Sequence, residues 1–239
     1  MIELDKLSKT FTQKNGKEFR AVDSVSLTVE KGEICVFLGP SGCGKTTTLK
    51  MINRIIPPTS GRVLIDGQDT ADLDEVTLRR HIGYVIQQIG LFPNMTIEEN
   101  IMVVPRLLGW DKARCKEKAR ELMSMVKLEP KQYLQRYPRE LSGGQQQQLA
   151  IGRALASQPR LLILDEPTEG IQPSVIKEIG TVVRSLAARG DMAILLVEQF
   201  YDFAAELADQ YLVMARGEIV QQGRGRDMES EGVRGLVAI

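Results

Sequence analysis

The chain has 239 residues, 43% of them hydrophobic and 26% charged, and its 31 basic side chains balance its 31 acidic ones. That length and apolar content suffice for one large domain with a substantial core, whereas a net charge of zero argues against a protein that binds DNA or RNA. Because no apolar run approaches the roughly 20 residues of a membrane-spanning helix, and the start MIELDKLSK lacks the core of a signal peptide, we expect a cytoplasmic protein that does not insert into the membrane.

The first third of the chain has the pattern of β-strands. Residues 25–29 alternate between apolar and polar side chains, as on a strand with one buried face, and Asn15-Gly16 is a strong signal for a hairpin turn. Residues 34–38 are apolar throughout, which is typical of a strand covered on both faces. Shorter strands are expected at 62–65 and 82–86.

The rest of the chain predicts a helical part and then an alternation of strands and helices. Apolar side chains recur at helical spacing over 113–128. Further on, the patterns predict a strand at 161–164, a helix at 174–189, a strand at 192–197, a helix at 203–208 and a hairpin that turns at Arg216-Gly217. This order predicts a parallel α/β core with a helical insertion and an antiparallel sheet near the N-terminus.

The segment GPSGCGKT follows the predicted strand at 34–38 and opens a predicted helix at 46–53. It matches the phosphate-binding pattern G-x-x-x-x-G-K-[ST], in which glycines let backbone N–H groups face phosphate oxygens at a helix N-terminus. Lys45, which we also count as catalytic, would bring its charge to the terminal phosphates, and the Thr46 hydroxyl would bind Mg²⁺. The predicted nucleotide-binding residues of this segment are Gly39, Pro40, Ser41, Gly42, Cys43, Gly44, Lys45, Thr46 and Thr47.

Two acidic residues end the apolar run in RLLILDEPT (160–168). Beside a phosphate loop, two successive carboxylates indicate a division of roles. Asp165 is predicted to bind Mg²⁺, and Glu166 is predicted to be the catalytic residue that faces the water attacking the γ-phosphate. Because phosphoryl transfer depends mainly on positioning and electrostatics, Glu166 could accept a proton or simply orient that water.

The segment LSGGQ (141–145) precedes another predicted helix. Ser142 and Gln145 have the spacing of a capping box, and the amides of Gly143 and Gly144 at the helix start would form a second anion site. One triphosphate needs only one such anion-binding site. We therefore expect these four residues to bind a nucleotide that another copy of the chain holds.

Four segments occur in the order and spacing of one protein family: GPSGCGKT, YVIQQ, LSGGQ and LLILDEP. On these segments the chain resembles the nucleotide-binding subunit of an ATP-binding cassette (ABC) transporter over essentially its full length. The resemblance implies an ATPase with a P-loop NTPase (RecA-like) core that uses ATP and Mg²⁺. It also implies one domain over 1–239, with a core and β-subdomain at 1–87 and 160–239 and a helical subdomain at 88–159.

The same resemblance assigns three further residues. Gln87 would sense Mg²⁺ and the γ-phosphate from the end of a strand, so we count it with the metal site. Phe11 stands where an aromatic ring stacks on adenine, unless it is a core residue. Gln199, in VEQ, stands where the family has a histidine at the γ-phosphate, and glutamine cannot become cationic near neutral pH. We expect a weakened sensor and impaired hydrolysis, unless Gln199 is an ordinary residue at a strand end.

The resemblance also implies two partners. When ATP binds, two copies would pair head-to-tail, so that the phosphate loop of one faces LSGGQ of the other. A membrane permease would dock in a groove formed by 87–139 and hold the chain at the cytoplasmic face of the membrane.

Two parts of the chain resemble different importers. Up to about Leu141 the resemblance is to ATPases of osmoprotectant uptake (glycine betaine, carnitine or choline) and rests on HIGYVIQQIGLFPNMTIEENI and VPRLLGW. From LSGGQQQQLAIGRAL onward it is to ATPases of urea and branched-chain amino acid importers and rests on LDEPTEGIQPS and AILLVEQFYDFAAELAD. We therefore predict an importer ATPase, with an osmoprotectant permease favoured, and a recombinant or engineered chimera with its seam at 141–147. Three alternatives stay open: a single natural lineage, a cassette without a working transporter, and the ATPase of a urea or branched-chain amino acid importer.

Overall fold

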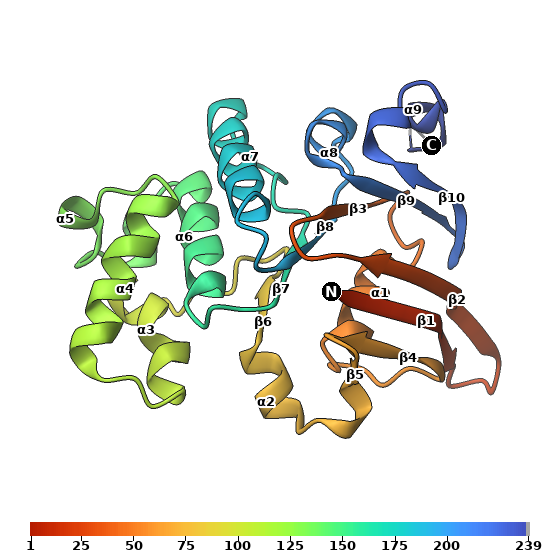
Figure 1. Ribbon diagram of the computed structural model, residues 1–239, viewed down its shortest axis with the longest axis horizontal. Helices are drawn as coiled ribbons and strands as arrows, with labels where there is room; N and C mark the ends of the chain where they lie inside the picture. Colours follow the sequence, from red (N-terminus) through yellow and green to blue (C-terminus); the bar gives the residue numbers. More distant parts are fainter. Residues whose placement is uncertain (238–239) are drawn as a thin grey trace.

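Two β-sheets of different kinds form the framework of residues 1–237, the part of the chain that the computed structural model describes (Figure 1). One sheet has six strands in the order β10-β9-β3-β8-β7-β6. Its strands are β3 (Ile34–Leu38), β6 (Ile82–Val85), β7 (Leu161–Asp165), β8 (Ala193–Val197), β9 (Gln210–Ala215) and β10 (Glu218–Arg224). All neighbouring pairs are parallel except β9 and β10. The predicted α/β class with a parallel core is confirmed.

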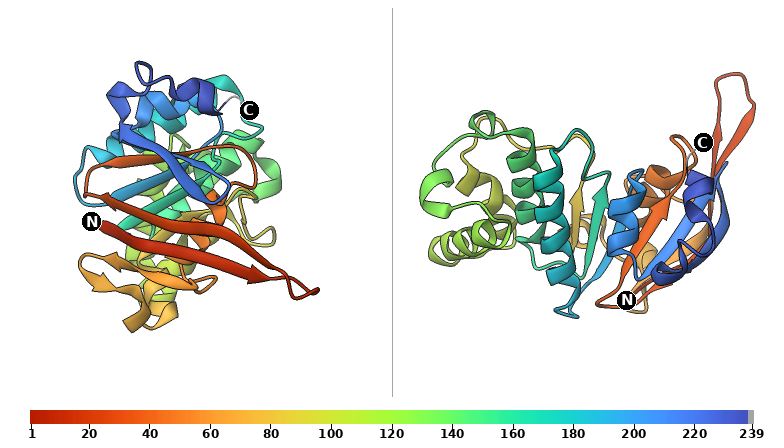
Figure 2. Two further views of the ribbon diagram at one scale, coloured as in Figure 1. Left: turned by 90° about the vertical axis from the view of Figure 1, so that its right-hand side faces the viewer. Right: turned by 90° about the horizontal axis from the view of Figure 1, so that it is seen from above.

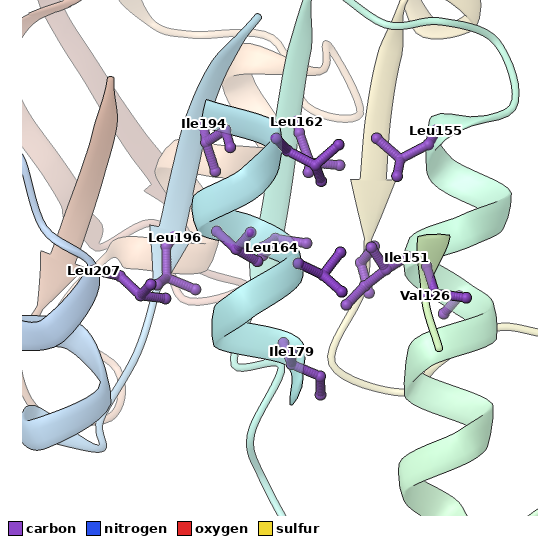
Figure 3. Packing of buried hydrophobic residues seen from close by; sticks show 14 of the residues in the cluster. Val126, Ile151, Leu155, Leu162, Leu164, Ile179, Ile194, Leu196 and Leu207 are labelled. Carbon is purple, nitrogen blue, oxygen red and sulfur yellow. The ribbon is translucent and has the colours of Figure 1, made fainter. Parts of the chain in front are cut away.

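The central strands β3, β7 and β8 are apolar throughout because both faces of the sheet are covered. All five residues of each strand are buried, and alternate side chains enter two separate cores, so that Val36 lies in one and Phe37 in the other. In the first core, side chains of β7 and β8 pack against α6 (Gly143–Leu155) and α7 (Pro173–Ala187), as Figure 3 shows. The strands predicted from uninterrupted apolar runs are therefore correct.

The second sheet is antiparallel and has the order β2-β1-β4-β5. Its strands are β1 (Ile2–Thr12), β2 (Glu18–Val29), β4 (Ser60–Ile65) and β5 (Gln68–Asp69). The predicted turn at Asn15-Gly16 joins β1 and β2, and Gly16 has the positive φ, 78°, that suits such a turn. The resulting hairpin projects from the body of the molecule (Figure 2). The antiparallel sheet near the N-terminus is confirmed, with longer strands than the apolar alternation indicates.

The helices fall into groups around the six-stranded sheet. α1 (Lys45–Ile52) follows β3, and α2 (Glu75–Arg80) precedes β6. A lobe beyond β6 contains α6 together with α3 (Ile97–Leu107), α4 (Lys112–Met125) and α5 (Pro130–Tyr133) (Figure 1). α7, α8 (Tyr201–Leu207) and α9 (Val233–Val237) lie in the last third of the chain. Of the helices in residues 1–237, none has the length and apolar content to cross a bilayer.

Helix α4 ends at Met125, three residues before the end that the apolar spacing predicts. Lys127 adopts a left-handed φ of 64°, and the Leu128 N–H donates to the Met123 carbonyl at 2.9 Å. A hydrogen bond from an N–H beyond the helix back to a carbonyl of its last turn is a common way for a helix to end. Val126 and Leu128 remain buried after the helix has ended, so their apolar character extends the pattern beyond the helix itself.

Candidate functional site

One group of the predicted site residues follows the carboxyl ends of parallel strands, which meet along one edge of the six-stranded sheet (Figure 1). The phosphate loop follows β3, Gln87 follows β6, Glu166 follows β7, and Gln199 follows β8. The strand register pairs Asp165 with Val197, so the ends of β7 and β8 are level. In open α/β sheets, this edge is where ligands bind.

The phosphate loop is folded so tightly that two of its glycines have no room for a side chain. Gly39 and Gly44 have φ values of 136° and 115°, which other residues rarely adopt. A β-carbon on Gly39 would collide with the Met214 carbonyl, and one on Gly44 would lie 2.6 Å from the Ala21 carbonyl. The loop is therefore held between β9 and β2, and α1 begins directly after it with Lys45, Thr46 and Thr47.

The Lys45 side chain lies within this loop and is only 4% exposed. Its Nζ atom donates to the carbonyls of Gly39 at 2.5 Å and Pro40 at 3.0 Å. The buried thiol of Cys43 lies 3.8 Å from the same atom. Since hydrogen bonds between ions are stronger than those to neutral carbonyls, an ammonium held in this way can exchange its carbonyl partners for phosphate oxygens.

Asp165 and Thr46 place two oxygen-bearing side chains side by side. The Thr46 hydroxyl donates to one oxygen of the Asp165 carboxylate at 3.4 Å, and the Tyr84 hydroxyl donates to the other at 3.3 Å. Burial raises the pKa of the Asp165 carboxyl, and the hydrogen bond from Tyr84 opposes that rise. Carboxylate and hydroxyl oxygens are the donors that Mg²⁺ prefers. The residues present therefore fit a Mg²⁺ ion that binds together with a nucleotide.

Glu166 is held by a glutamine on each side. Its Oε1 accepts from Nε2 of Gln199 at 2.7 Å, and its Oε2 accepts from Nε2 of Gln87 at 2.9 Å. Gln87 also donates to Glu169 at 2.9 Å. A cavity of about 340 Å³ lies beside these groups, and half-exposed Phe200 forms part of its wall. Two of the residues that the sequence predicts at the reacting phosphate, Gln87 and Gln199, thus each form a hydrogen bond with the third, Glu166.

Glu198 is a polar residue of this region to which the sequence analysis assigned no role. Its side chain is 2% exposed, and its carboxylate accepts hydrogen bonds from Thr168 and from the backbone of Gln199 and Phe200. Burial raises its pKa, and these hydrogen bonds lower it in part. No local signal separates Glu198 from Glu166, which also follows a fully buried strand but is only partly buried.

The residues of LSGGQ lie at the start of α6, in the helical lobe. The predicted capping box is present: the Gln145 N–H donates to the Ser142 hydroxyl at 3.3 Å, and the Ser142 N–H donates to the Gln145 amide oxygen at 3.0 Å. A β-carbon on Gly143 would meet nothing within 4 Å, whereas one on Gly144 would touch Val175. Within residues 1–237, no hydrogen bond joins this segment to the phosphate loop.

Phe11 lies near the end of the β1–β2 hairpin, directly opposite Phe19. Its ring is 39% exposed and has the Lys9 ammonium 5.1 Å from its centre, so it is not a core residue. The hairpin is anchored to the phosphate loop through the close approach of Ala21 and Gly44. Stacking of Phe11 on adenine stays a prediction.

A protein-family model described as ABC transporter matches residues 22–169, which is more than half of the chain. The chain belongs to the ABC transporter family. The match includes the phosphate loop, Gln87, LSGGQ and both acidic residues at the end of β7.

Several members of the family are similar over most of this chain. The osmoprotectant import ATP-binding protein OsmV of Salmonella typhimurium is 56% identical over 92% of the chain and 58% of its own length. The glycine betaine/carnitine/choline transport ATP-binding protein OpuCA of Bacillus subtilis is 49% identical over 93% of the chain and 57% of its own length. The chain thus spans less than three-fifths of these relatives. The dimeric post-hydrolysis structure of the ATP-binding cassette MJ0796, bound to ADP and Pi, superposes with a TM-score of 0.85 at 31% identity and covers 95% of this chain and 99% of its own.

These similarities give no support to a seam at 141–147. The match to OsmV covers 92% of the chain, so it necessarily runs through those residues and well into the part predicted to resemble urea and branched-chain amino acid importers. One osmoprotectant relative therefore accounts for both parts. Nothing in the matches supports impaired hydrolysis either.

Proposed function

We propose that the chain is the ATP-binding and hydrolysing subunit of an ABC importer for osmoprotectants such as glycine betaine, carnitine or choline. One observation carries the ATPase part: one edge of the sheet brings together Lys45, the pair of Thr46 and Asp165, and Glu166. Glu166 accepts hydrogen bonds there from two glutamines. The importer part is supported by the similarity to OsmV and OpuCA, whose names describe osmoprotectant transport.

In this proposal, residues 39–47 bind the phosphates of ATP through backbone N–H groups and the Lys45 ammonium. Thr46 and Asp165 would hold Mg²⁺, which when bound neutralises charge on the β- and γ-phosphates. Glu166 orients the attacking water and takes its proton while the water oxygen bonds to the γ-phosphorus. The bond from that phosphorus to the bridging oxygen breaks, and ADP and phosphate are released.

Gln87 and Gln199 act on this step through their amide groups. Each donates to one oxygen of Glu166, which fixes the direction in which the carboxylate faces the water. We propose that both amides also contact the γ-phosphate when ATP is bound, and that Gln87 contacts the metal ion as well. Because an amide carries no charge, Gln199 stabilises the charge of the transition state less than a protonated histidine would.

A second copy of the chain supplies the other half of the site in this proposal. The capping box engages the Gln145 N–H, Gly143 is exposed, and the space next to Gly143 is open. Ser142, Gly143, Gly144 and Gln145 of one copy would then bind the γ-phosphate held by the phosphate loop of the other. The dimeric state of the MJ0796 cassette supports this arrangement.

The proposed permease site lies where the core (1–87 and 160–239) meets the helical subdomain (88–159). Phe92 and Met95 are each more than a third exposed although they are large and apolar. Buried Asn100 accepts from the Phe92 N–H and donates to the Phe92 and Met95 carbonyls at 2.8 to 3.2 Å, so hydrogen bonds hold the turn that presents them. Exposed apolar side chains on such a turn suit docking of a permease at the cytoplasmic face of the membrane.

Reconstitution tests the two parts of this proposal separately. We expect the purified chain to hydrolyse ATP with Mg²⁺, and an osmoprotectant permease in liposomes to bind the chain and raise its rate. A branched-chain amino acid permease is the matched control. Hydrolysis without a response to either permease would contradict the importer part alone, a response only to the control would favour the second resemblance, and a failure to bind ATP would contradict both parts.

A further inference from the structure

Glu198 is a buried carboxylate that the proposed mechanism does not use. It follows β8 and is 2% exposed, although carboxylates are almost never fully buried unless they are paired. None of the ion pairs found among residues 1–237 includes it. A buried charge without an ionic partner must be satisfied by hydrogen bonds, or the fold is destabilised.

The two oxygens of the Glu198 carboxylate bind two different loops. Oε1 accepts from the Thr168 N–H at 3.2 Å and from the Thr168 hydroxyl at 2.9 Å. Oε2 accepts from the N–H groups of Gln199 at 3.1 Å and Phe200 at 3.3 Å. The carboxylate thus has four donors, and it joins the loop that follows β7 to the loop that follows β8.

Both loops carry residues of the proposed catalytic site close to these bonds. Glu166 lies two residues before Thr168, and Gln199 follows Glu198 directly. Their side chains meet at 2.7 Å. Glu166 also has a positive φ of 50°, a backbone conformation that a non-glycine residue keeps only when its surroundings hold it. The Glu166 N–H donates to the Val197 carbonyl at 2.9 Å, and beyond this backbone contact the Glu198 carboxylate ties the two loops together. The contact between Glu166 and Gln199 therefore depends on two loops that Glu198 joins.

We propose that Glu198 is a positioning residue for ATP hydrolysis, which holds the loops after β7 and β8 at the separation that sets Glu166 against Gln199. The inference rests on the proposed ATPase function. A carboxylate that only stabilised the fold would change the unfolding of the protein when replaced, and would leave the turnover of the folded molecules as it was.

The first test replaces Glu198 with glutamine, which keeps the shape but turns one acceptor oxygen into an N–H donor that faces other donors. We expect kcat to fall about tenfold or more, because a misplacement of about 1 Å can cost on the order of 100-fold. The KM for ATP, and its Kd by calorimetry, should stay close to wild type, since the phosphate loop is untouched. Glu206→Gln makes the same change at an exposed position on α8 and should leave kcat unaltered.

A second pair of variants probes the other end of the bond. Thr168→Val removes the hydroxyl donor at nearly constant volume, whereas Thr168→Ser keeps it. We expect Thr168→Ser to retain more of kcat than Thr168→Val. In the double variant, Thr168→Val should add little to the loss caused by Glu198→Gln, because both changes break the same contact.

Each outcome decides the proposal. A wild-type kcat in Glu198→Gln, with or without a lower melting temperature, would show that Glu198 is a structural residue only. If Glu198→Gln does not fold, equal kcat values for Thr168→Val and Thr168→Ser would overturn the proposal instead. If the wild-type chain hydrolyses no ATP, it is the proposed function that fails.

Discussion

Tyr84 affects the proposed metal site through a single hydroxyl group. That hydroxyl donates to the Asp165 carboxylate at 3.3 Å, and such outer hydrogen bonds orient metal-binding carboxylates. We expect Tyr84→Phe to weaken Mg²⁺ binding in the presence of ATP by roughly tenfold or more, with little change in metal-free ATP binding. Titration with Mn²⁺, followed by electron paramagnetic resonance, would measure the metal affinity directly and would not depend on the rate of hydrolysis. Equal Mn²⁺ affinities of the wild type and Tyr84→Phe would show that the Tyr84 hydroxyl does not contribute to metal binding by Asp165.

Gln199 is the residue at which this chain departs from the pattern it resembles, and its effect should depend on pH. A histidine has an ordinary pKa of about 6.5, and a nearby carboxylate such as Glu166 favours its charged form. We therefore expect Gln199→His to raise kcat most at acidic pH, where the ring is cationic, and to lose the gain as pH rises. Gln199→Ala should lower kcat at every pH. Unchanged turnover in Gln199→Ala would make Gln199 an ordinary strand-end residue.

The sequence reveals the residues of the site better than it reveals how they are held. Two acidic residues at the end of an apolar run identify Glu166, and the resemblance to the family identifies Gln199. The sequence analysis assigned no role to Glu198, because a shift of one position along the chain changes whether a side chain after a strand points into the protein or out of it. That direction follows from the backbone hydrogen bond that the Glu198 N–H donates to Phe37, and such a contact between distant segments leaves no mark in the local pattern.

Among the secondary structure elements, those with a single strong pattern were predicted and the mixed ones were not. Every residue of β3, β7 and β8 is buried, and these strands therefore appear in the sequence as apolar runs. α3 was missed although Thr96 and Glu99 form a capping box at its start. Pro105 lies inside this helix, and proline argues against a helix interior because it has no N–H to donate. Packing against α4 and α6 outweighs that local preference.

Asp66, in the turn between β4 and β5, ties several elements together. Its carboxylate pairs with the Met1 amine at 3.0 Å, Lys31 at 3.1 Å and Arg160 at 3.2 Å, which joins the antiparallel sheet to the start of β7. Although burial acts to raise the pKa of Asp66, the hydrogen bonds from Met1 and Lys31 outweigh it, and the pKa lies below its ordinary value. The folded state therefore favours the charged form of Asp66.

We expect Asp66→Asn to lower the free energy of unfolding by about 1–2 kcal/mol near pH 7, the sum of a few modest ion pairs. Since the folded-state pKa is lowered, this stabilisation is complete above the ordinary carboxyl pKa of about 4 and disappears as pH falls through the folded-state value. Urea unfolding of both proteins over pH 2–8 would measure it. Asp72→Asn, at an exposed position, is the control, and a difference that does not shrink in acid would contradict the role of the charge.

At the scale of the whole molecule, the order of the strands is what the sequence could not supply. Apolar periodicity indicates which segments are strands, but the order β10-β9-β3-β8-β7-β6 depends on connections that cross the sheet. That order sets β7 and β8 side by side next to β3, and so brings Glu166, Gln199 and the phosphate loop to one edge. The same order places α6 beside the edge strand β6 (Figure 1). Ser142 and Gly143 at the start of α6 are exposed, which suits contact with a second copy of the chain.

A variant that binds ATP but hydrolyses it slowly would test directly whether two copies of the chain form a dimer. We expect Glu166→Gln to bind ATP as the wild type does and to hydrolyse it at least about 100-fold more slowly, because the water loses the group that takes its proton. ATP then persists between the two phosphate loops and the two LSGGQ segments, so a dimer should elute from a sizing column with ATP and a monomer without it. Glu206→Gln, which leaves the site intact, should show no lasting dimer. A Glu166→Gln variant that hydrolyses normally would remove Glu166 from catalysis, and one that holds ATP but stays monomeric would contradict the head-to-tail pairing.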